Sequence, residues 1–310
     1  MAGHVGCRWR RGDWSVPVPV LSAEIEAKVL AGRTVPGRVR LELLPGEIVA
    51  VVGPSGCGKS TLLRILAGLD TDYSGQVFAA GQALRRPDPL RVGVMFQEPR
   101  LLPWLRVADN VTLGVDDTPQ ASCGRHPPWG GITLGEVRPD TDSPCGLSVP
   151  AERHRTPAGG GPAGARDPIA ARERALSLLA EVGLGGDADA LPRTLSGGMA
   201  QRVALARAMF SEPAVLLLDE PFSAVDAIAR ARLRDLVAAV ARRHGVAVLI
   251  VTHDVEDAVT LAGRVLVMAS SPGRIRREIV VPSPGKPSAG VQGEAALEDT
   301  VMSVLALRRG

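Results

Sequence analysis

An aliphatic strand that runs directly into a glycine-rich loop constrains the fold of this 310-residue chain more than any other feature. The run Ile48–Val52 is apolar throughout, which indicates a strand buried on both faces. The loop that follows fits G-x-x-x-x-G-K-[ST], and leucines at helical spacing come after it. Its residues are Gly53, Pro54, Ser55, Gly56, Cys57, Gly58, Lys59, Ser60 and Thr61. This strand–loop–helix order predicts a phosphate-binding P-loop in an α/β sheet.

The loop's composition predicts how it would hold a nucleoside triphosphate. Its glycines let backbone N–H groups converge on phosphates, and the helix behind it adds the positive end of its dipole. Lys59 is predicted to reach the β- and γ-phosphates, Ser60 to ligate Mg²⁺, and Thr61 to contact the α-phosphate side. A glycine-rich turn that binds nothing is the alternative, and the complete motif with correct flanks disfavours it.

Two acidic residues at the end of another aliphatic run complete such a site. Residues 215–218 are Val-Leu-Leu-Leu, and Asp219 and Glu220 follow them directly. Asp219 is predicted to hold Mg²⁺, largely through water, and Glu220 to polarise the water that attacks the γ-phosphate. Alone, the pair would be an ordinary acidic cap at a strand end, but the upstream P-loop favours the catalytic interpretation.

Apolar runs and helical patterns alternate along the rest of the chain. A helix is predicted for residues 196–210, and Gly245 ends another that contains Leu233 and Val240. Strands that alternate with helices predict a largely parallel α/β sheet. Further strands are expected at residues 91–96, 214–218, 246–251, 265–268 and 275–281.

The most specific motif is an octapeptide in the second half of the chain. It consists of Leu195, Ser196, Gly197, Gly198, Met199, Ala200, Gln201 and Arg202. With this motif, the P-loop and the acidic pair in order, residues 45–280 resemble the nucleotide-binding subunit of an ATP-binding cassette (ABC) transporter. The resemblance implies a P-loop NTPase fold of the ABC ATPase type. Such a fold has a mostly parallel core sheet, an antiparallel β part and an α-helical signature subdomain.

The resemblance also implies a working dimer that binds ATP and Mg²⁺. Ser196, a good N-cap, would cover the triphosphate held by the other copy together with Gly197 and Gly198. Asp226 would cross the dimer interface, and His253 would contact the γ-phosphate. The implied catalytic residues are Glu220, His253, Gln97 and Lys59, and the implied metal ligands are Ser60, Gln97 and Asp219.

Composition divides the chain into a leader, one domain with an insertion, and a tail. Residues 1–20 are interpreted as a disordered leader, 21–281 as the ABC domain with a helical subdomain at about 97–210, and 282–310 as a linker with a short C-terminal helix. Residues 117–168 hold nine prolines and nine glycines among 52 residues, which predicts a flexible surface insertion. Its possible metal ligands are Cys123, His126, Cys145 and His154. Their spacing favours a solvated linker over a zinc site, with an accessory docking surface as the functional alternative.

Charge and cysteine usage exclude several classes of protein. The net charge is +3 and the basic residues are spread along the chain, so no nucleic-acid-binding stripe is expected. The four cysteines lie far apart, which is not a disulfide framework and favours a reducing compartment. No apolar run approaches the ~18 residues of a membrane span. The resemblance therefore implies peripheral attachment at the cytoplasmic face of the membrane.

Two further segments resemble importers of the nitrate, sulfonate and taurine type, a group that includes thiamine-precursor systems. They cover residues 96–104 and 268–275. The apolar stretch Leu101 to Trp104 is interpreted as part of a groove for a helix of a membrane subunit. The implied partners are a second copy of the chain, a transmembrane permease and, indirectly, an extracytoplasmic solute-binding protein.

One departure from the family leaves adenine recognition and rival functions open. Residues 21–44 contain no aromatic residue to stack on adenine, and Trp14 lies 39 residues before Gly53. Adenine is expected to lie on Val29, Leu30 or a partner surface instead. A soluble ABC ATPase that acts on nucleic acid or ribosomes is the alternative function. A catalytically impaired cassette is a third interpretation, which the intact Lys59, Glu220 and His253 disfavour.

Overall fold

The computed structural model describes residues 18–30, 33–113, 167–223, 225–269 and 273–281, together with Val301 and Ser303. The predicted leader, almost all of the predicted insertion and most of the C-terminal tail lie outside the described residues. So do Cys123, His126, Cys145 and His154. In the part of the chain that is described, no helix has the length and apolar character needed to cross a membrane.

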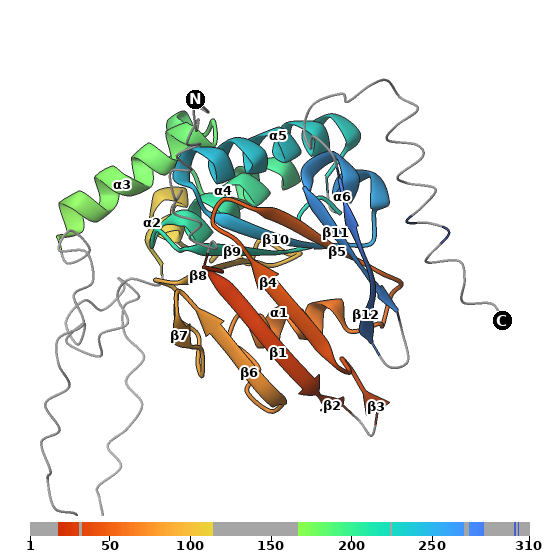
Figure 1. The fold of residues 1–310 in the computed structure, drawn as a ribbon. Helices are drawn as coiled ribbons and strands as arrows, with labels where there is room; N and C mark the ends of the chain where they lie inside the picture. Colours follow the sequence, from red (N-terminus) through yellow and green to blue (C-terminus); the bar gives the residue numbers. More distant parts are fainter. Residues whose placement is uncertain are drawn as a thin grey trace, which may run out of the picture.

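A six-stranded sheet forms the centre of the molecule (Figure 1). Its strand order is β12-β11-β5-β10-β9-β8, and all neighbours pair in parallel except β11 and β12. The strands are β5 (Ile48–Val52), β8 (Val92–Met95), β9 (Val215–Asp219), β10 (Ala247–Thr252), β11 (Arg264–Ala269) and β12 (Arg274–Val280). The predicted parallel sheet is confirmed, and β9 extends one residue further than predicted, so that Asp219 belongs to the strand.

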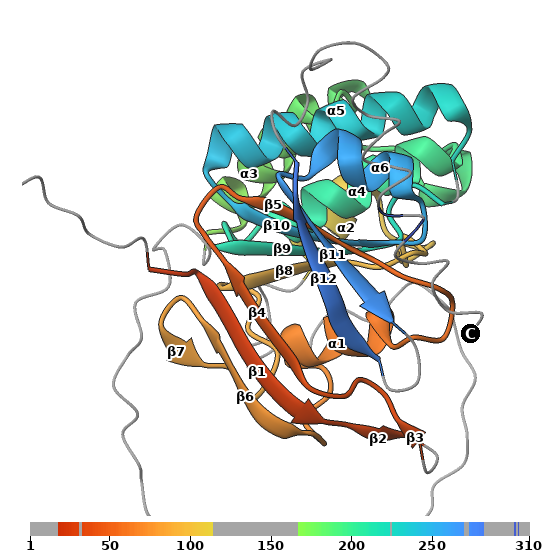
Figure 2. The same cartoon turned by 45° about the vertical axis from the view of Figure 1, so that its right-hand side comes forward.

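Successive residues of the central strands point to opposite faces, and both faces are covered. In β9, Leu216 and Leu218 pack into a cluster with helices α4 (Gly197–Met209) and α5 (Ala227–His244). Val215 and Leu217 pack into the other cluster, with α1 (Lys59–Leu66). Figures 1 and 2 show α1 on one face of the sheet and α4 and α5 on the other. This double burial explains why the strand sequences are aliphatic without alternation.

An antiparallel sheet covers the face on which α1 lies (Figure 2). Its order is β4-β1-β6-β7, and the inward residues of β1 alternate with exposed ones. Its strands are β1 (Leu21–Ala27), β4 (Val39–Leu43), β6 (Ser74–Ala79) and β7 (Gln82–Ala83), and a separate pair is formed by β2 (Val29–Leu30) and β3 (Arg33–Thr34). The antiparallel β part that the family resemblance implies is therefore present.

Side-chain caps fix where the helices on the second face begin. Ser196 accepts a hydrogen bond from the N–H of Met199 at the start of α4, and Asp226 from that of Ala229 at the start of α5. Gly245 ends α5 in the left-handed conformation, as predicted. The remaining helices are α2 (Val107–Thr112), α3 (Pro168–Glu181) and α6 (Val255–Leu261), with 3₁₀ turns η2 (Gly185–Asp187) and η3 (Pro192–Thr194).

The boundary of the predicted insertion differs at its C-terminal end. Asp167 caps α3 by accepting from the N–H of Ile169, and Pro168 is the first residue of that helix. The two residues therefore belong to the packed helical subdomain rather than to the insertion. Pro168 adds to the proline content of the preceding segment, but proline at the first helical position is also a helix-start signal.

The α5–α6 contact generates a prediction about stability and pH. Burial, with a smaller contribution from the Asp254 carboxylate, raises the pKa of Asp257 to about 6. Because the folded-state pKa lies above the unfolded one, protonated Asp257 stabilises the fold more than ionised Asp257 does, and this advantage is lost as pH rises from about 4 to about 6. The free energy of unfolding of Asp257→Asn, measured with urea, should therefore rise relative to that of the wild type by roughly 2–3 kcal/mol between pH 4 and pH 7.

Glu256→Gln removes one charge from an exposed side chain of the same helix and controls for the change in net charge. A stability difference between Asp257→Asn and the wild type that stays constant over this pH range would contradict the prediction.

Candidate functional site

The parallel strands deliver four sequence segments to one edge of the central sheet. Thr252 lies beside Val52, and Val251 lies beside Asp219, so β5, β9 and β10 end level with one another. The P-loop follows β5, Glu220 follows β9, His253 follows β10, and Gln97 comes two residues after β8. Residues that lie up to 200 positions apart in the chain thus meet at the carboxyl ends of neighbouring strands.

The P-loop is wrapped around the stem of Lys59. The Lys59 ammonium donates to the carbonyl oxygens of Gly53 at 2.8 Å and Pro54 at 3.3 Å, and the side chain is buried. The N-cap of α1 is Gly58, which offers no side-chain cap, and the first turn carries no acidic residue. Backbone N–H groups in the first turn of a helix have no partner within it. These observations fit a loop whose ligand is an anion.

Two loop glycines are required by their surroundings. A Cβ on Gly53 would lie 2.6 Å from the carbonyl oxygen of Met268, and one on Gly58 would lie 2.7 Å from Val35. Gly58 also has φ +103°, a conformation that side chains rarely adopt. A Cβ on Gly273 would lie 1.9 Å from the Cys57 carbonyl. Met268 and Gly273 therefore pack directly against the P-loop.

Ser60 and Asp219 form the part of the site that fits a metal ion. The Ser60 hydroxyl donates to the Asp219 carboxylate at 3.0 Å across 159 positions of sequence. Burial raises the pKa of Asp219, the Ser60 hydrogen bond opposes that shift, and the nearby Glu220 carboxylate adds to it. A hydroxyl and a carboxylate are hard oxygen donors of the kind that Mg²⁺ prefers. A dedicated cluster of three or more His, Cys, Asp or Glu side chains is absent from the described residues.

Glu220 and His253, which the sequence assigns to the same site, are in direct contact. The imidazole Nδ1 lies 2.7 Å from the Glu220 carboxylate, which is 14% exposed, while His253 is 62% exposed. Glu220 has φ +48°, and its N–H donates to the Val251 carbonyl at 2.8 Å. A non-glycine residue in this conformation costs about 1–3 kcal/mol and is found where the surrounding structure holds it. The carboxylate is thus fixed beside an imidazole at the mouth of the site.

Gln97 reaches the site through a residue that the sequence analysis did not select. Its amide donates to the Ser223 hydroxyl at 3.4 Å, and that hydroxyl donates to the Glu220 carbonyl at 3.0 Å. Gln201, fully buried on α4, donates to the Gln97 carbonyl at 2.8 Å. These two hydrogen bonds hold the Gln97 segment beside the Glu220 loop, and the predicted role of Gln97 toward the metal stays a prediction. The one available sequence signal was proximity to residues already selected. Ser223 lies three positions before Asp226, and Gln201 lies five positions after Ser196.

The signature residues lie with the Asp226 segment and not with the P-loop helix. A Cβ on Gly198 would lie 3.3 Å from Ala229 of α5, so the starts of α4 and α5 touch. Ser196, Gly197 and Asp226 are all exposed. Their helices cover the face of the sheet opposite α1 (Figures 1 and 2). One copy of the chain therefore presents these residues outward.

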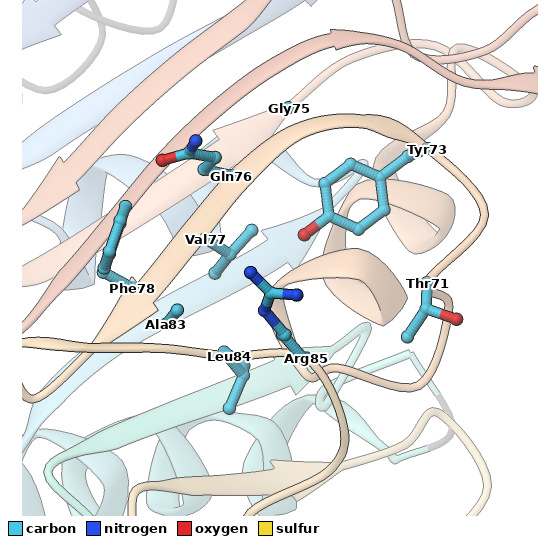
Figure 3. Close-up of a pocket in the computed structure, with 9 residues that line it drawn as sticks. All are labelled: Thr71, Tyr73, Gly75, Gln76, Val77, Phe78, Ala83, Leu84 and Arg85. Atoms are coloured by element: carbon cyan, nitrogen blue, oxygen red, sulfur yellow. The ribbon is translucent and has the colours of Figure 1, made fainter.

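A separate hollow of about 550 Å³ lies on the antiparallel sheet (Figure 3). Tyr73, Gln76 and Arg85 contribute its polar groups, and the Tyr73 hydroxyl points toward Arg85. None of the residues selected from the motifs lines it. This hollow is consequently distinct from the strand-end site.

The comparisons with known proteins agree with the motifs and the geometry. A family model described as ABC transporter matches residues 37–223, well over half of the chain. The chain belongs to the ABC transporter family. Its domain is that of an ABC ATPase, which binds and hydrolyses ATP, and the fold and the family expected from the motifs are both confirmed.

Several relatives are named aliphatic sulfonates import ATP-binding proteins. The one from Burkholderia lata is 48% identical over 86% of this chain and 79% of its own length. The one from Pseudomonas syringae pv. syringae is 43% identical over 86% of this chain and 87% of its own length. The one from Xanthomonas axonopodis pv. citri is also 43% identical, over 92% of this chain and 95% of its own length.

Solved structures share the fold. The dimeric, ADP- and Pi-bound post-hydrolysis state of the ATP-binding cassette MJ0796 has a TM-score of 0.60 and 25% identity, and covers 85% of this chain and 99% of its own. CbiO1 from Clostridium perfringens, part of the cbiONQ complex, has a TM-score of 0.61 and 21% identity over 94% and 96% of the two chains.

The absence of an aromatic residue between positions 21 and 44 generates a prediction about base selectivity. Val29 is 59% exposed and offers a smaller surface than an aromatic ring, while the side chain of Leu30 lies outside the described residues. Stacking on a full ring contributes ~1–3 kcal/mol. The dissociation constants for ATP and GTP, measured by calorimetry, should therefore agree within about tenfold.

Val29→Tyr should tighten the binding of both nucleotides, because an aromatic ring stacks on either purine. Val280→Tyr, at a position 71% exposed on β12, is the matched control. A strong preference of the wild type for ATP would contradict the prediction.

Proposed function

We propose that the chain is the ATP-hydrolysing subunit of an importer for aliphatic sulfonates or a similar small solute. The relatives at 43–48% identity carry that printed function over most of this chain. The structural observation that carries the proposal is the Glu220–His253 contact of 2.7 Å at the mouth of a complete P-loop site. The same relatives favour import over a soluble ABC ATPase, and the intact Lys59, Glu220 and His253 argue against an impaired cassette.

Each residue of the site has a proposed role in hydrolysis. The P-loop backbone and Lys59 hold the phosphates, and Glu220 orients the attacking water and accepts its proton. His253 keeps that carboxylate in place and donates toward the γ-phosphate side. Ser60 and Asp219, with Gln97, would hold Mg²⁺, which supplies positive charge to offset that of the phosphates. Most of the catalysis is thus positioning and charge neutralisation.

Two copies are proposed to complete two sites. Ser196, Gly197, Gly198 and Asp226 of one copy would cover the phosphates bound to the other. The exposed positions of Ser196, Gly197 and Asp226 in one copy support this arrangement, as does the dimeric state of the MJ0796 cassette. Binding of ATP between copies would close the dimer, and hydrolysis would let it reopen.

The proposed membrane contact is the segment that precedes α2. Trp104 is 71% exposed, although an apolar side chain of this size is normally covered. Asn110 is fully buried and holds the segment in shape, since its amide donates to the carbonyls of Leu102, Leu105 and Arg106 at 3.1 Å. A rigid loop that presents an exposed indole supports docking of a permease helix. The chain would then work at the cytoplasmic face of the membrane, with a solute-binding protein acting indirectly through the permease.

Glu220→Gln tests the proposed hydrolysis directly. The amide keeps the shape of the side chain but cannot accept a proton, so kcat should fall at least about 100-fold while ATP still binds. Sedimentation with ATP should show the variant accumulating as a dimer. Glu212→Gln, at an exposed Glu three residues beyond α4, is the control and should retain wild-type turnover. Near-normal ATPase activity in Glu220→Gln would rule out the assigned role.

Trp104→Ala tests the proposed membrane contact. Because Trp104 is exposed, its removal should leave the melting temperature and ATPase activity of the isolated chain within error of the wild type. Recovery of the permease with the tagged chain from detergent extracts should fall about tenfold or more, since buried Trp residues often dominate interfaces. Phe78→Ala, an exposed aromatic on the antiparallel sheet, is the control. Equal recovery with both variants would contradict the assignment.

A further inference from the structure

We propose that the ion pair between Arg230 and Asp254 is a positioning link between the segment that carries Asp226 and the segment that carries His253. The inference rests on the proposed function, because it takes Asp226 to meet the other copy and His253 to serve the site of its own copy. Through this pair, contact with the other copy would set the position of the Glu220–His253 unit. The pair would thereby couple the two ATP sites of the dimer.

The two charged residues lie next to the functional loops in both sequence and space. The Arg230 guanidinium lies 2.8 Å from the Asp254 carboxylate. Arg230 is one turn into α5, and its N–H donates to the Asp226 carbonyl at 2.8 Å. Asp254 follows His253 directly and is the N-cap of α6. The ion pair therefore spans the gap between the two helix starts.

Both oxygens of the Asp254 carboxylate have defined partners. One oxygen accepts from the N–H groups of Glu256 at 3.0 Å and Asp257 at 3.4 Å, and the other faces Arg230. The carboxylate is thus oriented by the helix it caps, and the guanidinium is oriented by the carboxylate. Side chains that are 31% and 28% exposed are partly shielded from solvent screening. A displacement of α5 would be passed to the residue that follows His253.

A second ion pair one turn further along the helices provides an internal comparison. Arg234 lies 3.2 Å from both Glu256 and Asp257. It joins the same two helices, but on α5 it lies one turn further from Asp226 than Arg230 does. If the pairs served only to hold α5 against α6, their loss would have similar consequences. The position of the first pair predicts instead that its loss changes catalysis.

The test is a comparison of Asp254→Asn with Glu256→Gln in the full chain. Asn is as good an N-cap as Asp, so Asp254→Asn keeps the start of α6 and removes the charge that faces Arg230. Steady-state ATPase assays over a range of ATP concentrations should give a kcat about tenfold lower for Asp254→Asn with KM little changed. Its Hill coefficient for ATP should fall toward 1. Glu256→Gln should keep the wild-type kcat and Hill coefficient.

Arg230→Gln and the double variant complete the cycle. Arg230→Gln should reproduce the kinetics of Asp254→Asn, and the double variant should be no slower than either single variant. If Asp254→Asn proves too unstable to purify, Arg230→Gln takes its place in the comparison. Arg230→Lys should then restore part of the rate that Arg230→Gln loses. Equal kinetics for Asp254→Asn and Glu256→Gln, or an unchanged Hill coefficient in Asp254→Asn, would overturn the link.

The same ATPase assay distinguishes failure of the proposed function from failure of the Arg230–Asp254 link. A wild-type chain without ATPase activity, alone or with its permease, would overturn the proposed function and the link with it. An active wild type with active, fully cooperative Asp254→Asn and Arg230→Gln variants would overturn the link alone.

Discussion

The parallel pairing of β5, β10 and β9 is the constraint on which the site depends. Their register brings Val52 level with Thr252, and Val251 level with Asp219. Since parallel strands end at the same edge, the loops that follow must meet there. The hydrogen bond from Ser60 to Asp219 and the contact of Glu220 with His253 are direct consequences. A slip of one residue in β9 would turn both acids to the wrong faces of the sheet.

The same sheet separates the P-loop helix from the residues proposed to cover ATP in the other copy. The P-loop helix α1 packs on one face, while α4 and α5, with the signature residues and Asp226, pack on the other (Figures 1 and 2). A buried two-sided sheet is rigid, so small loop movements within one copy would not carry the signature across it. This geometry favours completion of each site by a second copy. Contacts between the starts of α5 and α6 would then connect the residues that face the second copy to those of the strand-end site.

The sequence predicted the elements that have a local pattern of residues. Aliphatic runs located the central strands, glycine and lysine located the P-loop, and strand-end acids located Asp219 and Glu220. It did not predict β6, which is largely exposed and polar, or the short helix α6, whose stability comes from packing. Nor did it predict the Ser223 link and the Arg230–Asp254 pair, because such contacts depend on side-chain positions set by tertiary structure. The roles of the site residues remain proposals.

The most direct test of the central claim is a crystal structure of Glu220→Gln with Mg²⁺ and ATP. The account predicts a dimer in which the γ-phosphate lies between Lys59 of one copy and Ser196 of the other, with the metal against Ser60 and Asp219. ATP bound only to a single copy, or capped by the Ser196 of the same chain that supplies Lys59, would contradict it.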